Sequence, residues 1–258
     1  MTRTKSERER LRAYRRAFFE RIATRAEPLE HGVAVFTPAH PTKWDLNLLI
    51  VDDASGATAE ELMAEAERLQ APAGLRHRKI EALGGADALV DGFVAAGWTA
   101  ERLVVMLLRP GTDRRGETPA AAVREVGFGP VRGLMERWYG ETMSAAEARD
   151  LADADADIEE AGGGRYFLVE RDGDAAASCV LLGTDGIGQV EEVYTSKAHR
   201  GHGLASAVIR AAIAASHERG DDLVMIMADA DDWPQRLYER LGFETVDVFR
   251  TFTRKPPA

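Results

Sequence analysis

The segment from Val190 to Phe243 constrains the fold of this chain more than any other part of the sequence. A β-branched strand over 190–195 leads into the turn 200–205, RGHGLA, and an apolar-periodic helix follows. Two glycines at such a turn let backbone N–H groups point toward one place without interference from a Cβ atom. No Ser, Thr, Asp or Asn stands in the turn to cap the helix. Its first N–H groups are therefore available to a phosphate.

The elements after the turn further restrict the folds that this segment can adopt. The helix Leu204–Glu218 ends at Gly220, and Leu223–Ala228 has the apolar composition of a buried strand. A second helix follows over Trp233–Leu241, with a proline in its first turn and Gly242 directly after it. A strand, a glycine turn and a helix are common alone, whereas this complete order is restrictive.

This order closely resembles the GNAT N-acetyltransferase superfamily. Its Arg/Gln-x-x-Gly-x-Gly/Ala signature is met by Arg200, Gly203 and Ala205, and its Leu-Tyr-x-x-x-Gly-Phe stretch by residues 237–243. The resemblance implies that the turn binds the pyrophosphate of acetyl-CoA, the cosubstrate, and that the preceding strand hydrogen-bonds the pantetheine arm. The cofactor-binding residues that it implies are Val193, Tyr194, Thr195, Arg200, Gly201, His202, Gly203, Leu204 and Ala205.

Two positions depart from the family pattern. The family often has an asparagine before the tyrosine helix, where this chain has only aspartates and an alanine over 229–232. An aliphatic residue is also usual at the position of Thr195. Both departures concern the acceptor side more than the cofactor turn.

The sequence repeats itself on either side of a polar stretch, 111–119. Each half contains strand, helix, strand, helix and strand, with Val51 corresponding to Thr195 at an offset of 144 and Gly97 to Gly242 at 145. We therefore expect an α+β fold of two GNAT-like lobes, each with a mixed, largely antiparallel sheet flanked by helices. The predicted domains are a degenerate lobe over 1–110, a linker over 111–119 and a catalytic domain over 120–258. The predicted elements before the linker are a helix Ser6–Arg25, strands 44–51, 75–80 and 102–109, and helices 58–69 and 86–96.

The first repeat has lost the residues that the resemblance links to chemistry. Its helix 58–69, the counterpart of the helix after the glycine turn, begins with Thr58 and Glu61 in a capping-box pattern, which satisfies the N–H groups internally. The counterpart of Tyr238 is Phe93, which has no hydroxyl. We expect this repeat to bind no CoA and to serve as a wall of the acceptor cleft.

Transfer of an acetyl group from a thioester to an amine needs a base for the amine and an acid for the leaving thiolate. The resemblance implies Tyr238 as the acid; the alternative is a tyrosine packed in the helix face. Glu191 and Glu192 are the candidate bases, and side-chain alternation along a strand favours only one of them in the cleft. Glu192 is preferred, Glu191 stays open, and an exposed strand carboxylate is the alternative for either.

The acceptor side is predicted from the segment before the cofactor motif. A strand over 120–126 precedes helices 131–139 and 144–158, and in GNAT enzymes the turn between those helices rims the acceptor pocket. Here the turn contains Trp138, Tyr139 and Glu141, an aromatic pair and a carboxylate that suit a cationic amine. A tryptophan anchoring the helix in the core is the alternative.

Composition limits the remaining possibilities. A net charge of −10 argues against nucleic-acid binding, and Cys179 is the only cysteine. With no signal-peptide pattern and no apolar run of membrane-spanning length, a cytoplasmic monomer or homodimer is expected. The alternate aspartates Asp153, Asp155 and Asp157 suggest a solvated helix end rather than a calcium loop, and no metal is expected. An N-acetyltransferase for a small cationic amine is the leading hypothesis; peptide or protein acetylation and a non-catalytic CoA-binding module are the alternatives.

Overall fold

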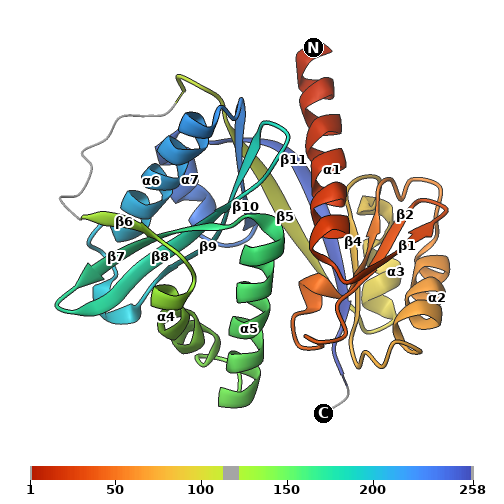
Figure 1. Ribbon diagram of the computed structural model, residues 1–258. Coiled ribbons are helices and arrows are strands. Elements are labelled where there is room, and N and C mark those ends of the chain that lie inside the picture. Colours follow the sequence, from red (N-terminus) through yellow and green to blue (C-terminus); the bar gives the residue numbers. More distant parts are fainter. Residues whose placement is uncertain (1, 113–121, 257–258) are drawn as a thin grey trace. The chain divides into compact units, whose positions relative to one another are not determined.

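The computed structural model describes residues 2–112 and 122–256, with side chains described from Glu7 (Figure 1). The described residues form seven α-helices and eleven strands. The helices are α1 Thr2–Ile22, α2 Ala59–Gln70, α3 Val90–Ala95, α4 Gly129–Tyr139, α5 Ala145–Gly162, α6 Leu204–Arg219 and α7 Pro234–Leu241. The strands are β1 Arg25–Leu29, β2 Gly32–Phe36, β3 Leu48–Val51, β4 Arg78–Ala82, β5 Thr99–Leu108, β6 Val123–Val126, β7 Arg165–Arg171, β8 Asp174–Leu182, β9 Ile187–Thr195, β10 Leu223–Asp229 and β11 Glu244–Arg254.

Both predicted repeats are present as elements. The first repeat is β3-α2-β4-α3-β5 and the second is β9-α6-β10-α7-β11. The predicted amino-terminal helix is α1, which ends before Arg25 because that residue begins β1. Most of the predicted linker 111–119, and the first residues of the strand predicted over 120–126, lie outside the described residues. Among the described helices, none combines the length and the hydropathy needed to cross a membrane.

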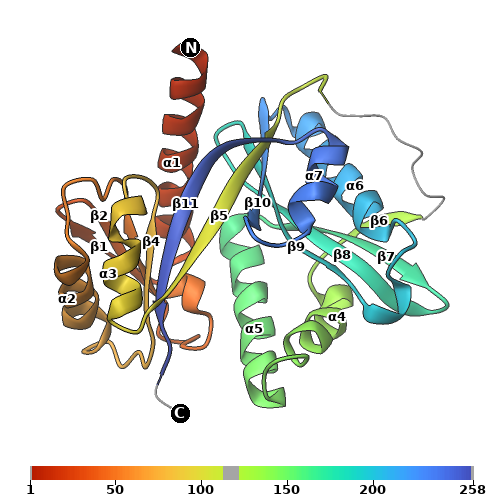
Figure 2. The same ribbon diagram turned by 180° about the vertical axis from the view of Figure 1, so that it is seen from behind.

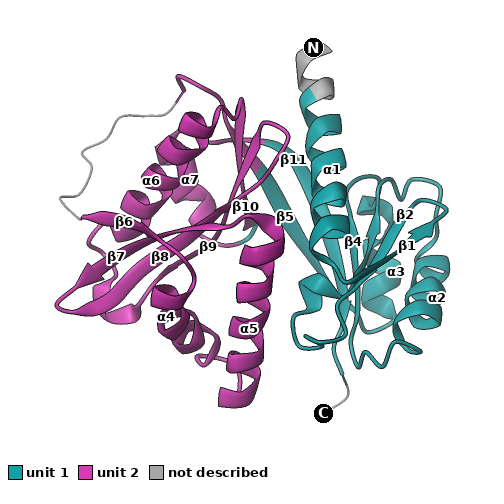
Figure 3. Ribbon diagram, viewed as in Figure 1, with its two compact units in different colours: residues 1–105, 229–231, 246–258 teal, residues 106–228, 232–245 magenta. Residues whose placement is uncertain are grey.

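The strands form one mixed sheet in the order β1-β2-β3-β4-β11-β5-β10-β9-β8-β7-β6. The α+β class is confirmed, but the expectation of a separate sheet for each repeat is wrong. The reason lies in the two longest strands. β5 and β11 each contribute residues to both compact units of the chain, so the hydrogen-bonded ladder does not stop between the repeats (Figure 3).

Unit 1 comprises residues 1–105, 229–231 and 246–258. Within it, β1, β2 and β3 are antiparallel and β3 pairs in parallel with β4. β11 then pairs antiparallel with β4, from Arg250 opposite Ala82 to Arg254 opposite Arg78. The last strand of the second repeat therefore completes the sheet of the first unit, whereas the sequence prediction had placed it with the catalytic domain.

The two faces of the unit 1 sheet have different partners. Ile80 and Ala82 of β4 face the apolar core beneath α2 and α3, where the Phe93 ring stacks on Phe252 at 3.9 Å between centroids. Glu81, between them, points to the other face, because neighbouring strand residues alternate. There it accepts two hydrogen bonds, 2.8 and 3.0 Å long, from Arg15 of α1. The charge of Glu81, which is 1% exposed, is thus compensated in the interior.

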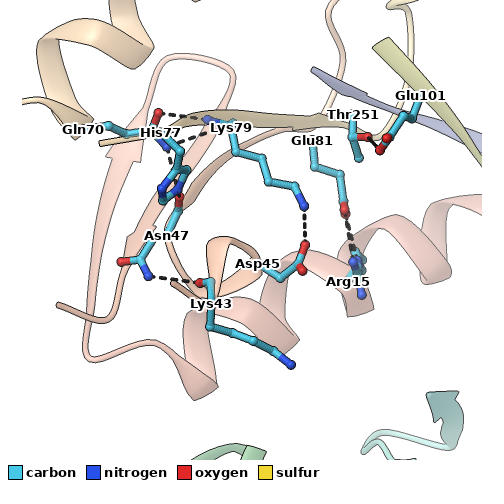
Figure 4. Close-up of polar contacts among 10 residues, drawn as sticks. All are labelled: Arg15, Lys43, Asp45, Asn47, Gln70, His77, Lys79, Glu81, Glu101 and Thr251. Carbon is cyan, nitrogen blue, oxygen red and sulfur yellow. Dashed lines mark hydrogen bonds and ion pairs between the residues drawn. The ribbon is translucent and has the colours of Figure 1, made fainter. Parts of the chain in front are cut away.

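A buried polar cluster holds the loop before β3 in unit 1 (Figure 4). The Nε2 atom of His77 lies 2.9 Å from the backbone oxygen of Asn47, and burial lowers the pKa of His77. Gln70 donates to the backbone oxygens of Asn47 and Lys79 and accepts from the Lys79 N–H. Trp44 stacks on His77 at 5.0 Å. The polar groups of this cluster are hydrogen-bonded to one another, so the cluster has a structural role.

Unit 2 comprises residues 106–228 and 232–245. β6 to β9 form an antiparallel meander, and β10 adds to β9 in parallel. α6 and α7 cover one face of these strands, and α4 and α5 cover the other (Figures 1 and 2). The second face is called the α4/α5 face below.

Candidate active site

A cavity opens in unit 2 where β9 and β10 separate. Their parallel pairing runs from Ile187 and Leu223 to Val190 and Ile226, although both strands continue for several residues. The diverging ends leave a cavity of about 540 Å³, within the usual range for small-molecule sites. It is lined by Trp138, Val193, Tyr194, Thr195, His199, Arg200, Gly201, Gly203, Leu204, Ala205, Ser206, Asp232, Trp233, Pro234, Leu237, Tyr238 and Arg240.

A β-bulge in β9 lies beside this cavity. Val180 is opposite Glu191 and Ser178 is opposite Tyr194, so Glu192 and Val193 together face the single residue Cys179. Glu192 has a φ of 53°, a strained value for a residue with a side chain. A bulge leaves the extra residue out of the ladder, which frees backbone groups at the cavity wall.

The glycine turn forms the start of α6. Gly201 and Gly203 have φ values of 80° and 74°, which glycine adopts without steric cost. Gly203 is the N-cap, and within the described chain no side chain caps this helix, as the sequence predicts. Arg200 donates to the backbone oxygen of Thr195 at 3.2 Å. Of the predicted cofactor residues, all line the cavity except His202, which is exposed in the same turn.

Tyr238 of α7 lies at the buried end of the cavity and is 6% exposed. Burial, with a further contribution from the charge of Glu191, raises its pKa far above the ordinary value. The hydroxyl therefore stays protonated throughout the neutral and mildly alkaline range. Cys179, behind the bulge, is also buried, and burial raises the pKa of its thiol. A thiol that stays protonated is a poor nucleophile, so Cys179 is not a candidate for covalent catalysis.

The bulge removes the strand alternation on which the choice between the two glutamates depended. Glu191 is paired with Val180, whose side chain lies against Gly164 directly after α5, so Glu191 belongs to the α4/α5 face. Glu192 lies on the same face, because its Oε1 is 3.4 Å from the Tyr139 hydroxyl of α4. Both carboxylates therefore face the same side, and the expectation that only one does is wrong.

The predicted acceptor residues form a stacked aromatic group. The Trp138 ring stacks on Tyr194 at 5.0 Å and on Tyr139 at 5.4 Å between centroids. Glu141 accepts a 2.7 Å hydrogen bond from the Tyr194 hydroxyl and pairs with Lys197 at 3.0 Å. These contacts lower the pKa of Glu141, while burial and Glu141 raise the pKa of Tyr194 to about 12. Trp138 alone of the three predicted residues lines the cavity.

Asp155 is a buried carboxylate, contrary to the expectation from the sequence. It is 1% exposed and accepts a 2.7 Å hydrogen bond from the Tyr139 hydroxyl, so the expectation of a solvated helix end is wrong at this position. The reason is that α5 continues to Gly162, which puts Asp155 inside the helix on its inward side. Asp153, by contrast, is half exposed and pairs with Arg132.

Seven lining residues were not predicted, and three of them, Trp233, Leu237 and Arg240, share one side of α7. They are spaced i, i+4 and i+7 along α7, the spacing of one helix face. That spacing is visible in the sequence and could have indicated them. No group of three or more His, Cys, Asp or Glu suited to a metal ion occurs among the described residues.

The equivalent region of the first repeat is closed. Thr58 caps α2 in a capping box with Glu61, as predicted. The parallel strands there continue to pair beyond β3 and β4, with Leu83 donating to Val51 at 2.8 Å and Ala54 to Gly84 at 2.9 Å. These two strands therefore stay hydrogen-bonded at the place where β9 and β10 separate.

Comparison with known proteins agrees with this geometry. A family model described as Acetyltransferase (GNAT) family matches residues 133–243, and no curated protein matches the sequence.

A GCN5-related N-acetyltransferase from Kribbella flavida has a TM-score of 0.70 at 20% identity, over 96% of this chain and 95% of its own. A functionally unknown conserved protein from Staphylococcus epidermidis has a TM-score of 0.71 at 10% identity, over 90% and 93%. A tandem GNAT protein from the clavulanic acid biosynthesis pathway has a TM-score of 0.50 at 18% identity, over 77% and 70%. These structural similarities concern the fold alone. Residues 133–243, which contain the bulged strand, the glycine turn and Tyr238, belong to the GNAT acetyltransferase family.

Proposed function

We propose that this chain is an acetyl-CoA-dependent N-acetyltransferase that acts on the primary amine of a small, cationic molecule. The observation that carries the proposal is one cavity that joins the bulge of β9, the uncapped glycine turn of α6 and the hydroxyl of Tyr238. Each supplies a part that acyl transfer from a CoA thioester needs.

The glycine turn fits a pyrophosphate. Its two glycines hold left-handed backbone conformations, and the N–H groups of the first turn of α6 point outward with the positive end of the helix dipole. The bulge at Glu192 and Val193 supplies backbone donors for the oxygen of the thioester carbonyl. When acetyl-CoA binds in this way, its sulfur atom lies beside the hydroxyl of Tyr238.

The reaction is a direct attack. The amine nitrogen forms a bond to the acetyl carbon, the C–S bond breaks, and its electron pair leaves with the sulfur. One proton passes from the amine to a carboxylate and one passes from Tyr238 to the thiolate. Glu191 is proposed as the base ahead of Glu192, because its charge contributes to the raised pKa of Tyr238. Once Glu191 takes the amine proton, that charge is gone and Tyr238 becomes the better acid.

The acceptor is proposed to approach from the α4/α5 face. Glu191, Glu192 and Asp155 place carboxyl groups there, beside the stacked rings of Trp138 and Tyr194. Carboxylates and aromatic faces both attract a cationic amine. Asp155 is 1% exposed and hydrogen-bonded to Tyr139, so it adds its carboxyl group to this face from the interior.

The test is a panel of amines with release of free CoA thiol as the readout. The panel contains cationic polyamines and aminoglycosides, neutral and anionic amines, and peptides with a free amino terminus. We expect turnover to be highest with a small cationic amine, and added salt to raise the KM of that amine more than the KM of acetyl-CoA.

A preference for peptides or folded proteins would replace the acceptor proposal while leaving an acetyltransferase. Acetyl-CoA binding without turnover on any amine would leave a non-catalytic CoA-binding module. Failure of acetyl-CoA to bind would overturn the proposed function as a whole.

A further inference from the structure

The cavity has a buried end and an exposed rim, which differ in chemistry. Tyr194, Leu204, Leu237 and Tyr238 are its buried residues. The exposed lining residues are Arg200, Gly201, Gly203, Asp232, Trp233 and Arg240. The buried end suits the acetyl thioester. The rim therefore faces the remaining part of the cosubstrate.

Trp233 is the most conspicuous group on this rim. Its side chain is 62% exposed, more than any other large hydrophobic residue of the described chain. An indole that large usually has an apolar partner, because leaving it in water gives up burial that is worth about 2 kcal/mol for a large apolar side chain. Nothing in the packing of α7 requires a tryptophan here, since Leu237, Tyr238 and Leu241 supply its buried contacts.

The backbone beneath this indole is fixed. The Asp232 carboxylate accepts a 2.7 Å hydrogen bond from the backbone N–H of Trp233, and the backbone N–H of Arg236 donates to the Trp233 carbonyl at 3.0 Å. Pro234 follows at the first position of α7, with its φ locked by the ring. The flat face is thus presented from a rigid support, which lowers the entropy lost when a ligand stacks on it.

The same rim carries positive charge. Arg200 lies at the glycine turn, and Arg240 lies two helical turns after Trp233 on the same face of α7, about 10 Å along its axis. With the N-terminus of α6, the rim offers two guanidinium groups, a set of backbone donors and one aromatic face. A ligand that matches all of these has phosphate groups and a planar base.

We propose that Trp233 is a stacking platform for the adenine ring of CoA and determines selectivity for the nucleotide portion of the cosubstrate. This rests on the proposed function, because it assigns one end of the ligand bound at that site. The pantetheine arm then runs from the glycine turn to Tyr238, and the adenine lies over the indole at the rim. Stacking of a base on an aromatic side chain is worth about 1–3 kcal/mol, which corresponds to a change in Kd of about 5- to 150-fold.

The experiment compares two ligands and three variants by calorimetry. Acetyl-CoA contains the nucleotide, whereas S-acetyl-4′-phosphopantetheine keeps the thioester arm and one phosphate but lacks it. We expect Trp233→Leu to weaken acetyl-CoA binding at least about 5-fold and to leave S-acetyl-4′-phosphopantetheine binding unchanged. Trp233→Phe, which keeps an aromatic face, should recover most of the lost affinity. Trp44→Leu, a tryptophan substitution in unit 1, should change neither affinity.

A second readout does not depend on affinity. Adenine stacked on an indole quenches its fluorescence, so acetyl-CoA should quench the wild-type protein more than it quenches Trp233→Leu. Equal losses for both ligands would show that Trp233 contacts the pantetheine arm, and an unchanged acetyl-CoA Kd with a raised acceptor KM would assign it to the acceptor. Either result overturns the inference and leaves the proposed function intact. If the wild-type protein binds neither ligand, the proposed function itself fails.

Discussion

The turns before α2 and α6 occupy equivalent places in the two repeats. The first N–H groups of α2 have side-chain hydrogen-bond partners, whereas those of α6 have no side-chain cap. Before α2, the side chain of Thr58 accepts from the N–H of Glu61, and the Glu61 carboxylate accepts from the N–H of Thr58. Before α6, Gly203 takes the cap position and leaves those groups to a ligand. A helix start is thus either completed internally or kept open as an anion site.

The strands next to these turns differ in the same sense. In the second repeat, β9 is bulged and separates from β10 after Val190. In the first repeat, β3 pairs with β2 in continuous register, from Gly32 opposite Val51 to Val35 opposite Leu48. On its other side, hydrogen bonding to the β4 strand continues past the end of β3, as far as the bond between Ala54 and Gly84. The two repeats therefore share the order of their elements and differ in the helix cap, the strand register and the separation of the parallel strands.

The largest expected effect tests the open turn. Gly203→Val places a β-branched residue at a φ of 74°, a strain of about 1–3 kcal/mol that also displaces the N–H groups of the turn. We expect acetyl-CoA binding to weaken by about 100-fold, measured by calorimetry.

The matched control lies in the first repeat. At Gly56 an added Cβ meets no atom within 4 Å, so Gly56→Val should leave acetyl-CoA binding unchanged. A titration that gives two acetyl-CoA sites per chain, or a loss of binding in Gly56→Val, would break the comparison between the turns.

The next effect concerns the hydroxyl group that Tyr238 has and its counterpart Phe93 in the first repeat lacks. Tyr238→Phe should lower kcat by about 100-fold, the range for a general acid, with the Kd of acetyl-CoA unchanged. Burial and Glu191 raise the pKa of Tyr238, so the acid form persists at higher pH than for a free phenol. The wild-type rate should therefore not fall as the pH approaches about 10, the ordinary pKa of tyrosine. A rate that falls from about pH 9 would contradict this assignment.

A smaller effect distinguishes the two glutamates of the bulge. Glu191→Gln should lower kcat/KM by about 10- to 100-fold at pH 7, and the defect should shrink as higher pH deprotonates the amine without help. Glu192→Gln should affect mainly the KM of the acceptor, because its carboxylate lies by Tyr139. If the pH-dependent defect appears in Glu192→Gln instead, the two roles are exchanged.

The smallest effect concerns the closed turn. Thr58→Ala removes the cap of α2 and should lower the free energy of unfolding by about 1 kcal/mol, measured in urea. Ser144→Ala, which removes the same capping box from α5 in unit 2, provides the comparison. Neither change should alter acetyl-CoA binding, and an effect of Thr58→Ala on the Kd of acetyl-CoA would show that the first repeat is not independent of the site.

Local sequence signals predicted much of this site, and the signals that were missing explain the errors. Glycines, caps and apolar periodicity are properties of neighbouring residues, so the glycine turn, α6, α7 and the capping box at Thr58 followed from the sequence. The bulge at Glu192 depends on the register between β8 and β9, and no glycine or asparagine marks it. The burial of Asp155 depends on its contact with Tyr139, sixteen positions away.

The two repeats exchange their final strands, so that β11 lies next to β4 and β5 lies next to β10. Neighbouring residues in the sequence could not predict this exchange, for the same reason. β11 has the composition of any half-buried strand, and nothing in it specifies β4 as its neighbour. That pairing is decided by long-range packing, in which Phe252 stacks on Phe93. Internal repeats therefore predicted the elements well and their partners poorly.

Because β11 completes the sheet of unit 1, that unit cannot finish folding on the ribosome until residues 246–254 have been made. Arg254 reaches back to Glu67, 187 positions earlier. At about 5–20 residues per second, some 10 to 40 seconds separate the synthesis of these two residues. During that time β4 presents an unpaired edge and Phe93 lacks the stacked ring of Phe252, a state prone to pairing with other chains. The repeat that is made first thus completes its sheet only once β11 has been made.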